Sequence, residues 1–196
     1  MYPYNHKMGQ KIQTDADEVA LDRSFLTHFQ VSPADAVAGS NIAVLAATAL
    51  TAATQSVIAN ITNPAVPRNI KIIGNAAGIL GDVVIKGTNY NGDAISETIA
   101  LNGNTAVEGT KAFRTVTEID LPVETHAGTD TVSVGFGEIL GLPYKLAHNT
   151  VLVTYLNNVK EATAPTVTVD AAVLENNTLK LNSALNGSVV DTYLIV

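Results

Sequence analysis

The sequence has no cysteine and no tryptophan, and basic residues are scarce, with 11 lysines and arginines among 196 residues. The missing cysteine excludes a disulfide framework, a thiolate zinc site and a cysteine nucleophile. The formal net charge of -7 argues against a nucleic-acid partner, because phosphate binding needs clustered cations. Stability must therefore come from apolar burial and from contacts between subunits.

Charge of either sign is also sparse: charged residues make up 15% of the chain, against about a quarter in an average protein. Alanine and valine dominate the hydrophobic 46%, which favours thin, closely packed sheets over a deep aromatic core. Threonine, asparagine and glycine fill much of the remainder. A surface of this kind suits tight contacts between subunits.

Long apolar runs are missing as well. The stretch that comes nearest to a membrane span, residues 42–61, is interrupted by threonine, glutamine, serine and asparagine, whereas a spanning helix needs about 20 mainly apolar residues. We therefore expect no membrane partner. Residues 1–7 lack the apolar region of a secretory signal, which predicts synthesis and assembly in the cytosol.

Short runs with an alternation of period two dominate the chain from about residue 55 onward. Valine and isoleucine alternate with threonine or charged residues, and glycine, proline and asparagine separate the runs. This pattern predicts an all-β fold with an antiparallel β-sandwich or barrel-like core. The expected strands are residues 56–61, 69–73, 82–86, 94–101, 113–119, 131–134, 151–155, 166–169, 178–181 and 189–195.

Two glycine-containing segments are predicted to be turns. Asn91-Gly92 lies between two β-like runs and offers the positive φ angles that a type I′ hairpin turn requires. The segment 74–81 is rich in glycine, but it precedes a strand and lacks the Lys-Ser/Thr pair with which a P-loop holds phosphate and magnesium. We therefore interpret it as a turn and expect no cofactor there.

Composition divides the chain into three parts. Residues 1–40 are predicted to form an N-terminal arm, extended or partly helical, because apolar residues recur at i, i+4 and i+8 behind an acidic turn. Residues 41–160 are predicted to be the main β-sandwich domain, with 41–54 ambiguous between a helix and an irregular strand. Residues 161–196 begin with a linker-like segment, 161–165, and form either a C-terminal β-hairpin unit or completing strands of the sandwich.

No arrangement of nucleophile and base is evident, so we expect that the protein is not an enzyme. A serine hydrolase would show a Gly-x-Ser-x-Gly elbow and a histidine held beside an acid, and this sequence has no such elbow. The histidines fall in arm or turn-like segments, where exposed or interface positions explain them: His6, His28, His126 and His148.

The acidic residues predict no metal site. Asp15-x-Asp17-Glu18 gathers three carboxylates, but the segment lacks the glycine and the distal glutamate of an EF-hand, and acidic residues are common in the first turn of a helix. The other carboxylates available for a glycosidase pair fall on polar strand faces or in loops: Glu97, Glu108 and Glu118. We therefore expect no catalytic, cofactor-binding or metal-binding residues.

A series of strand-and-turn phrases runs through the β region: Asn63–Ile70, Gly87–Ala94, Glu97–Gly103, Gly109–Val116, Ile119–Pro122 and Leu140–Lys145. Together they resemble tailed-bacteriophage virion structural proteins, in particular capsid decoration or auxiliary head proteins. The resemblance covers less than half of the chain and has no catalytic content.

The resemblance implies a β-module present in many copies on a virion. We expect an auxiliary capsid protein that decorates and stabilises the head, located on the capsid surface and assembled in the host cytoplasm. Its partners would be further copies of itself, in a closed homo-oligomer such as a trimer, and the phage major capsid protein. The alternatives are a tail, neck or head-fibre component and a surface module that binds a glycan or receptor.

Overall fold

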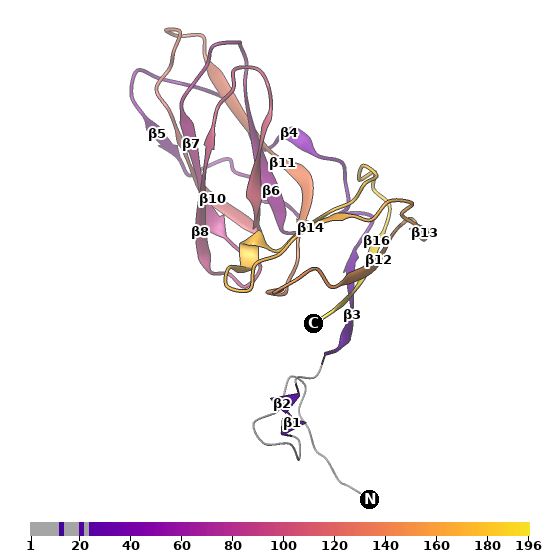
Figure 1. Cartoon of the computed structure of the whole chain (residues 1–196). Coiled ribbons are helices and arrows are strands. Elements are labelled where there is room, and N and C mark those ends of the chain that lie inside the picture. The colour runs from indigo at the N-terminus through magenta and orange to yellow at the C-terminus, as the bar shows by residue number, and fades with distance from the viewer. Residues whose placement is uncertain (1–11, 14–19, 22–23) are drawn as a thin grey trace, which may run out of the picture.

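The protein is an all-β molecule with two lobes, seen in a computed structural model that describes residues 12–13, 20–21 and 24–196 (Figure 1). The predicted fold class is confirmed, because all paired strands in this part of the chain are antiparallel. The described residues contain one 3-10 turn, Leu174–Asn176, and no longer helix. None of their helical structure is long and apolar enough to cross a membrane.

Most strands are short. They are β1 (Ile12–Gln13), β2 (Ala20–Leu21), β3 (Leu26–Val31), β4 (Ser40–Ala49), β5 (Gln55–Val57), β6 (Arg68–Gly74), β7 (Asp82–Thr88), β8 (Ala94–Ala100), β9 (Val107–Phe113), β10 (Thr115–Leu121), β11 (Thr131–Gly141), β12 (Val151–Leu156), β13 (Val159–Lys160), β14 (Thr166–Thr168), β15 (Thr178–Lys180) and β16 (Val190–Ile195). Each predicted run from residue 68 onward corresponds to a strand, but β9 was not predicted and β11 extends well beyond the predicted 131–134.

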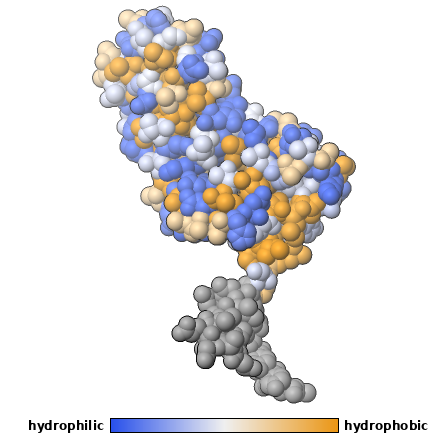
Figure 2. Space-filling view, in the orientation of Figure 1, coloured by the Kyte–Doolittle hydropathy of each residue, from blue (hydrophilic) through white to orange (hydrophobic). Residues whose placement is uncertain are grey.

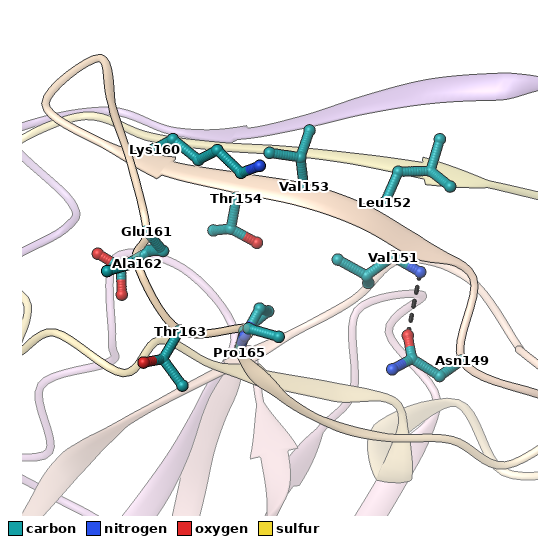
Figure 3. Close-up of a pocket in the computed structure, with 11 residues that line it drawn as sticks. Asn149, Val151, Leu152, Val153, Thr154, Lys160, Glu161, Ala162, Thr163 and Pro165 are labelled. Atoms are coloured by element: carbon teal, nitrogen blue, oxygen red, sulfur yellow. Dashed lines mark hydrogen bonds between the residues drawn. The ribbon is translucent and has the colours of Figure 1, made fainter.

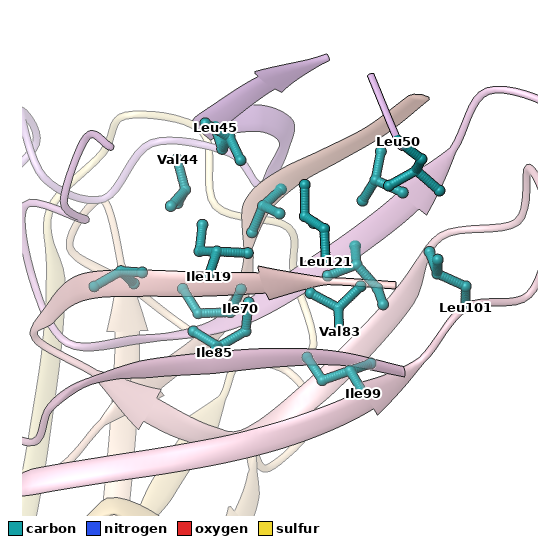
Figure 4. Packing of buried hydrophobic residues seen from close by; sticks show 14 of the residues in the cluster. Val44, Leu45, Leu50, Ile70, Val83, Ile85, Ile99, Leu101, Ile119 and Leu121 are labelled. Atoms are coloured by element: carbon teal, nitrogen blue, oxygen red, sulfur yellow. The ribbon is translucent and has the colours of Figure 1, made fainter. Parts of the chain in front are cut away.

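The first lobe is a sandwich of two sheets. One sheet has the order β5-β10-β7-β8, and the other contains β6 between β11 and β9, with β4 on the far side of β11. Alternation along β7 shows why these sequences form half-buried strands: Val83 and Ile85 are buried, whereas Val84 and Lys86 are only partly covered. Aliphatic side chains of both sheets meet between them (Figure 4), so the lobe has a core without tryptophan, as the composition predicted.

The two sheets of this lobe are joined along one side by a carboxylate. Oε1 of Glu97, on β8, accepts hydrogen bonds from the backbone N–H of Thr110 at 2.7 Å and from its hydroxyl at 3.0 Å. Nζ of Lys111 donates in return to the carbonyl of Ser96 at 3.0 Å. These contacts curl the sandwich towards a half-barrel by linking the β8 and β9 edges.

The second lobe is built on the sheet β13-β12-β16-β3. Its inner face packs against β15 and the C-terminal part of β11 in a separate apolar cluster that includes Val31, Leu140, Leu179 and Leu194. Strand β11 serves both lobes, because its first part pairs with β4 and β6 while Leu140 and Gly141 pair with β15. One continuous strand therefore connects the two cores.

Several segments whose structure the sequence left open are strands. Within the segment predicted as an arm, Leu26–Val31 is strand β3, so the helical alternative is wrong there, while residues 1–11 and 14–19 lie outside the described residues. The ambiguous segment 41–54 is mainly strand β4. After residue 161, β14 and β15 form a hairpin on β11, and β16 fills the gap between β12 and β3.

The hairpin predicted at Asn91-Gly92 is confirmed, but its turn type is wrong. Strands β7 and β8 pair up to Thr88 and Ala94, and only Gly92 has a positive φ, 91°. The backbone N–H of Gly92 donates to the Asn89 carbonyl at 3.1 Å, which describes a type I turn followed by a left-handed residue. A three-residue loop is thus favoured over a two-residue one.

The two-residue hairpin lies elsewhere, between β12 and β13. Asn157 and Asn158 have φ angles of 53° and 61°, and the flanking residues Leu156 and Val159 pair directly. Two successive left-handed residues define the type I′ turn, which asparagine tolerates better than other residues with a side chain. The glycine-rich segment 74–81 is a turn between β6 and β7, as predicted.

A buried arginine lies where the two lobes meet. Arg68, at the start of β6, is 1% exposed; its Nη1 donates to the Val37 carbonyl at 2.8 Å, and its guanidinium lies 4.5 Å from the ring centre of Phe136. Burial lowers the pKa of Arg68 to about 10, although the negative charge of Glu138 acts to raise it. Glu138 in turn accepts hydrogen bonds from the backbone N–H groups of Gly39 and Leu185. It therefore links strand β11 to the segments that precede β4 and β16.

Candidate functional surfaces

The outer face of the second-lobe sheet, the face turned away from its core, carries the most distinctive set of side chains. The register aligns them in rungs across the strands: Asp191 lies between Gln30 and Tyr155, and Tyr193 lies between His28 and Val153. The next rung contains Leu26 and Ile195. The face therefore changes from polar and aromatic at one end to apolar at the other.

The apolar end consists of Leu26, Leu152 and Ile195. Leu26 is 67% exposed and Leu152 59%. Figure 2 shows hydrophobic residues gathered at this end of the second lobe, beside the start of β3. Reciprocal backbone hydrogen bonds between Phe25 and Val196 fix the two chain segments that carry the patch. Clustered exposed aliphatic side chains on a sheet are typical of protein–protein contact surfaces.

The polar end is organised around the carboxylate of Asp191. Its Oδ1 accepts hydrogen bonds from Nε2 of His28 and Nε2 of Gln30, both at 2.7 Å. The His28 ring stacks on Tyr193, with ring centres 4.7 Å apart, and Tyr155 meets Tyr193 edge-on at 6.3 Å. A hollow of about 300 Å³ opens beside these groups, lined by Tyr155, Asn158, Asp191 and Tyr193.

A second hollow, of about 280 Å³, lies between β12 and the segment 160–165 (Figure 3). Strand β12 pairs with β13 only through Tyr155 and Leu156, so its earlier residues face this hollow. Thr154 is 2% exposed, and its hydroxyl has no hydrogen-bond partner within the described part of the chain. The lining combines apolar residues such as Val151 and Pro165 with the polar Asn149 and Thr163 and the charged Lys160 and Glu161.

The predicted histidines are not brought together. His28 lies on β3 and contacts Asp191, whereas His126 belongs to a loop of the first lobe, where its Nδ1 lies 3.0 Å from Oδ1 of Asp130. Burial raises the pKa of Asp130, but hydrogen bonds from the backbone and ring of His126 and from the Thr125 backbone outweigh it and lower the pKa overall. His148 lies in the loop before β12, and His6 falls outside the described residues.

The predicted acidic residues form ion pairs on the sheet surfaces. Lys86 on β7 contacts Glu118 at 3.0 Å and Asp120 at 2.8 Å. The hydrogen bond from Lys86, and one from Ser56, lower the pKa of Asp120, and the two carboxylates raise the pKa of Lys86. Glu108 lies 3.8 Å from Lys180, and Glu97 joins the two sheets. Residues 15–18 are outside the described part of the chain.

Across residues 24–196, no group of three histidine or acidic side chains converges in an arrangement that could hold a metal ion. Sequence reasoning missed the Asp191 cluster, because its members come from β3, β12 and β16, which are more than 100 residues apart at the extremes. The alternation in Asp191-Thr-Tyr193 was a local signal for one polar strand face. It could not show which residues would lie opposite.

Comparison with known proteins gives no relative: no family model, no curated protein and no solved structure matches this chain.

Proposed function

We propose that the chain is a structural virion protein of a tailed bacteriophage, an auxiliary capsid protein that decorates and stabilises the head and has no catalytic role. The strand-and-turn phrases that resemble such proteins support this proposal, together with the β-sandwich of the first lobe. The protein works as a homo-oligomer, such as a trimer, assembled in the host cytoplasm and bound to the major capsid protein at the outer surface of the virion.

The observation that carries the assembly role is the apolar end of the second-lobe sheet. Leu26 and Leu152 expose most of their side chains, and Leu26 lies directly opposite Ile195 in the β3–β16 pair. Burying one leucine side chain contributes about 1.5–3 kcal/mol, so a contact over this patch would contribute substantially to association.

The test combines the purified protein with undecorated capsids and, separately, with tails of the phage that encodes it. Co-sedimentation with capsids and regular density over their lattice in cryo-electron microscopy are the expected result. Binding to tails or necks alone would replace the decoration role with the tail, neck or head-fibre alternative. Binding to neither would remove the virion proposal.

Two variants test the contact surface itself. Leu26→Ser and Leu152→Ser should each weaken association by about tenfold, since each loses over 1.4 kcal/mol of apolar burial. Ile58→Ser is the matched control, because Ile58 is 74% exposed but lies in the first lobe, next to β5. Sedimentation velocity gives the oligomeric state, and equal effects of all three substitutions would show that the patch is not the interface.

A further inference from the structure

We propose that the polar end of the second-lobe sheet binds an alkylammonium group, in a cage formed by Tyr155, Tyr193 and Asp191. This site is independent of the capsid proposal. It rests on three observations: two aromatic rings at a right angle, a carboxylate held rigidly between them, and a hollow that opens onto all three side chains.

The two rings have the mutual geometry of a cation cage. Tyr155 and Tyr193 lie with ring centres 6.3 Å apart and planes at 89°, so they form two walls of a corner. A cation within about 6 Å of a ring centre is attracted by the negative ring face. The ring of His28 stacks on one face of Tyr193 at an angle of 11°. This contact favours the observed orientation of Tyr193 and leaves its other face for the ligand.

The carboxylate supplies the formal charge. The side chain of Asp191 is 13% exposed and lies directly opposite Tyr155 across the β12–β16 pair. Both of its hydrogen bonds, from His28 and Gln30, reach Oδ1. No described residue donates to Oδ2, and no lysine or arginine of the described chain lies within ion-pair distance of it. A partly desolvated anion in this state favours a cationic partner.

The hollow suits a small head group. Its volume, about 300 Å³, lies at the lower limit for ligand pockets, which run from about 300 to 1,000 Å³. Asn158 closes one side, because the type I′ turn places it three residues after Tyr155. The nearby N–H groups of His28 and Gln30 already donate to Asp191, so an anion or a sugar hydroxyl would find few free donors. A cation does not need a hydrogen-bond donor.

Two sources could supply such a group, a lysine side chain of a partner protein or a small quaternary ammonium compound. Lys160 of the same chain pairs with Tyr155 across the β12–β13 hairpin and does not fill the site itself, since it makes no ion pair with Asp191. Its positive charge opposes the ligand. Removing it with Lys160→Ala should therefore strengthen cation binding, by about two- to fivefold at low salt.

The experiment titrates the full chain, followed by NMR, with tetramethylammonium, choline and Nα-acetyl-lysine amide as probes. We expect dissociation constants on the order of 1–10 mM and shifts confined to residues near Tyr155 and Tyr193. The neutral isostere of choline, 3,3-dimethyl-1-butanol, should not bind. Preference for the lysine amide points to a protein partner, and preference for choline to a small molecule. Equal binding of the neutral isostere would overturn the proposal.

Variants distinguish the contribution of the Asp191 charge from that of the Tyr155 ring. Asp191→Asn should weaken cation binding at least tenfold, and Tyr155→Leu about fivefold, whereas Tyr155→Phe keeps the ring and should bind as the parent does. Tyr90→Leu is the control, since Tyr90 is 37% exposed in the β7–β8 loop of the other lobe. Unchanged amide spectra away from the site confirm folding of each variant. Full binding by Asp191→Asn would also overturn the proposal.

Discussion

The side-chain amide of Asn69 occupies the space beside Gly137 that any side chain at that glycine would need. Both neighbours of β6 bulge opposite Asn69: the pairing with β11 jumps between Phe136 and Leu140, and the pairing with β9 shifts next to it. A bulge leaves backbone N–H and C=O groups without their strand partners. The fully buried side chain of Asn69 takes the place of those partners, because it accepts a hydrogen bond from the Ile139 N–H at 3.1 Å and donates one to the Gly109 carbonyl at 3.0 Å.

Gly137→Ala should therefore destabilise the first lobe by about 1–3 kcal/mol, the usual cost of overpacking a filled site. The new methyl would push the Asn69 amide away from both of its backbone partners. Urea unfolding followed by circular dichroism measures the effect. Gly128→Ala is a useful comparison, because a Cβ at Gly128 meets nothing within 4 Å, although its φ of 73° adds some strain of its own. Equal stability of Gly137→Ala and the parent would contradict the packing argument.

Arg68 gives a prediction for the junction of the lobes. Arg68→Ala should lower the free energy of unfolding by about 3 kcal/mol, since it empties a fully buried site. Arg68→Met should cost less, because it keeps most of the volume and removes a buried cation whose Nε and Nη2 have no hydrogen-bond partner in the described chain. Guanidinium denaturation would measure both, and a larger loss for methionine than for alanine would refute this ranking.

The lowered pKa of Asp130 predicts that the protein loses stability in acid. Its pKa in the folded protein is lower than the ordinary 3.8, so its contribution is present above that value and is lost as the pH falls through the lower folded value. Asp130→Asn should lower Tm by a few degrees at pH 7, and the difference from the parent should shrink as the pH falls below the ordinary pKa of 3.8 and through the lower folded value. Scanning calorimetry from pH 2 to 7 tests this, with the exposed Asp82→Asn as control.

Gly92 tests the corrected turn. Its φ of 91° lies in the left-handed region, and a Cβ there would touch nothing within 4 Å, so only backbone strain opposes a side chain. Gly92→Val should cost about 1–2 kcal/mol, and Gly92→Asn should cost clearly less because asparagine tolerates positive φ. Thermal melts compare the two variants. If the two variants have the same Tm, backbone strain at this position does not limit stability.

The strands that sequence could predict are those whose alternation is local. Residues 82–86 and 94–101 are short runs rich in valine, isoleucine and threonine, and glycine or asparagine marks each end, which is sufficient to predict two strands and the hairpin between them. Strand β3 was missed because Phe25 and Phe29 also fit the i, i+4 spacing of a helix. Its partner β16, which decides in favour of a strand, comes 163 residues later at the His28–Asp191 contact.

Turn chemistry shows the same limit on a smaller scale. Asn91-Gly92 and Asn157-Asn158 both satisfy the preferences of a type I′ turn, yet only the second forms one. Asn89 makes the difference, since its Oδ1 accepts from the backbone N–H of Asn91 and of Asp93, both at 3.0 Å. That side chain stabilises the longer loop. A rule based on the two central residues does not include it.

Among the described residues, strand β3 pairs with β16 alone, and this affects the order in which the molecule can fold. A ribosome synthesises residues 26–31 early, but the strand that pairs with them in the described structure, residues 190–195, is synthesised last. The strands of the first lobe all lie between these segments and can pair sooner, because their contacts close shorter loops. The face that carries both proposed contact surfaces is therefore absent from the nascent chain, so neither partner can be engaged before synthesis of β16 is complete.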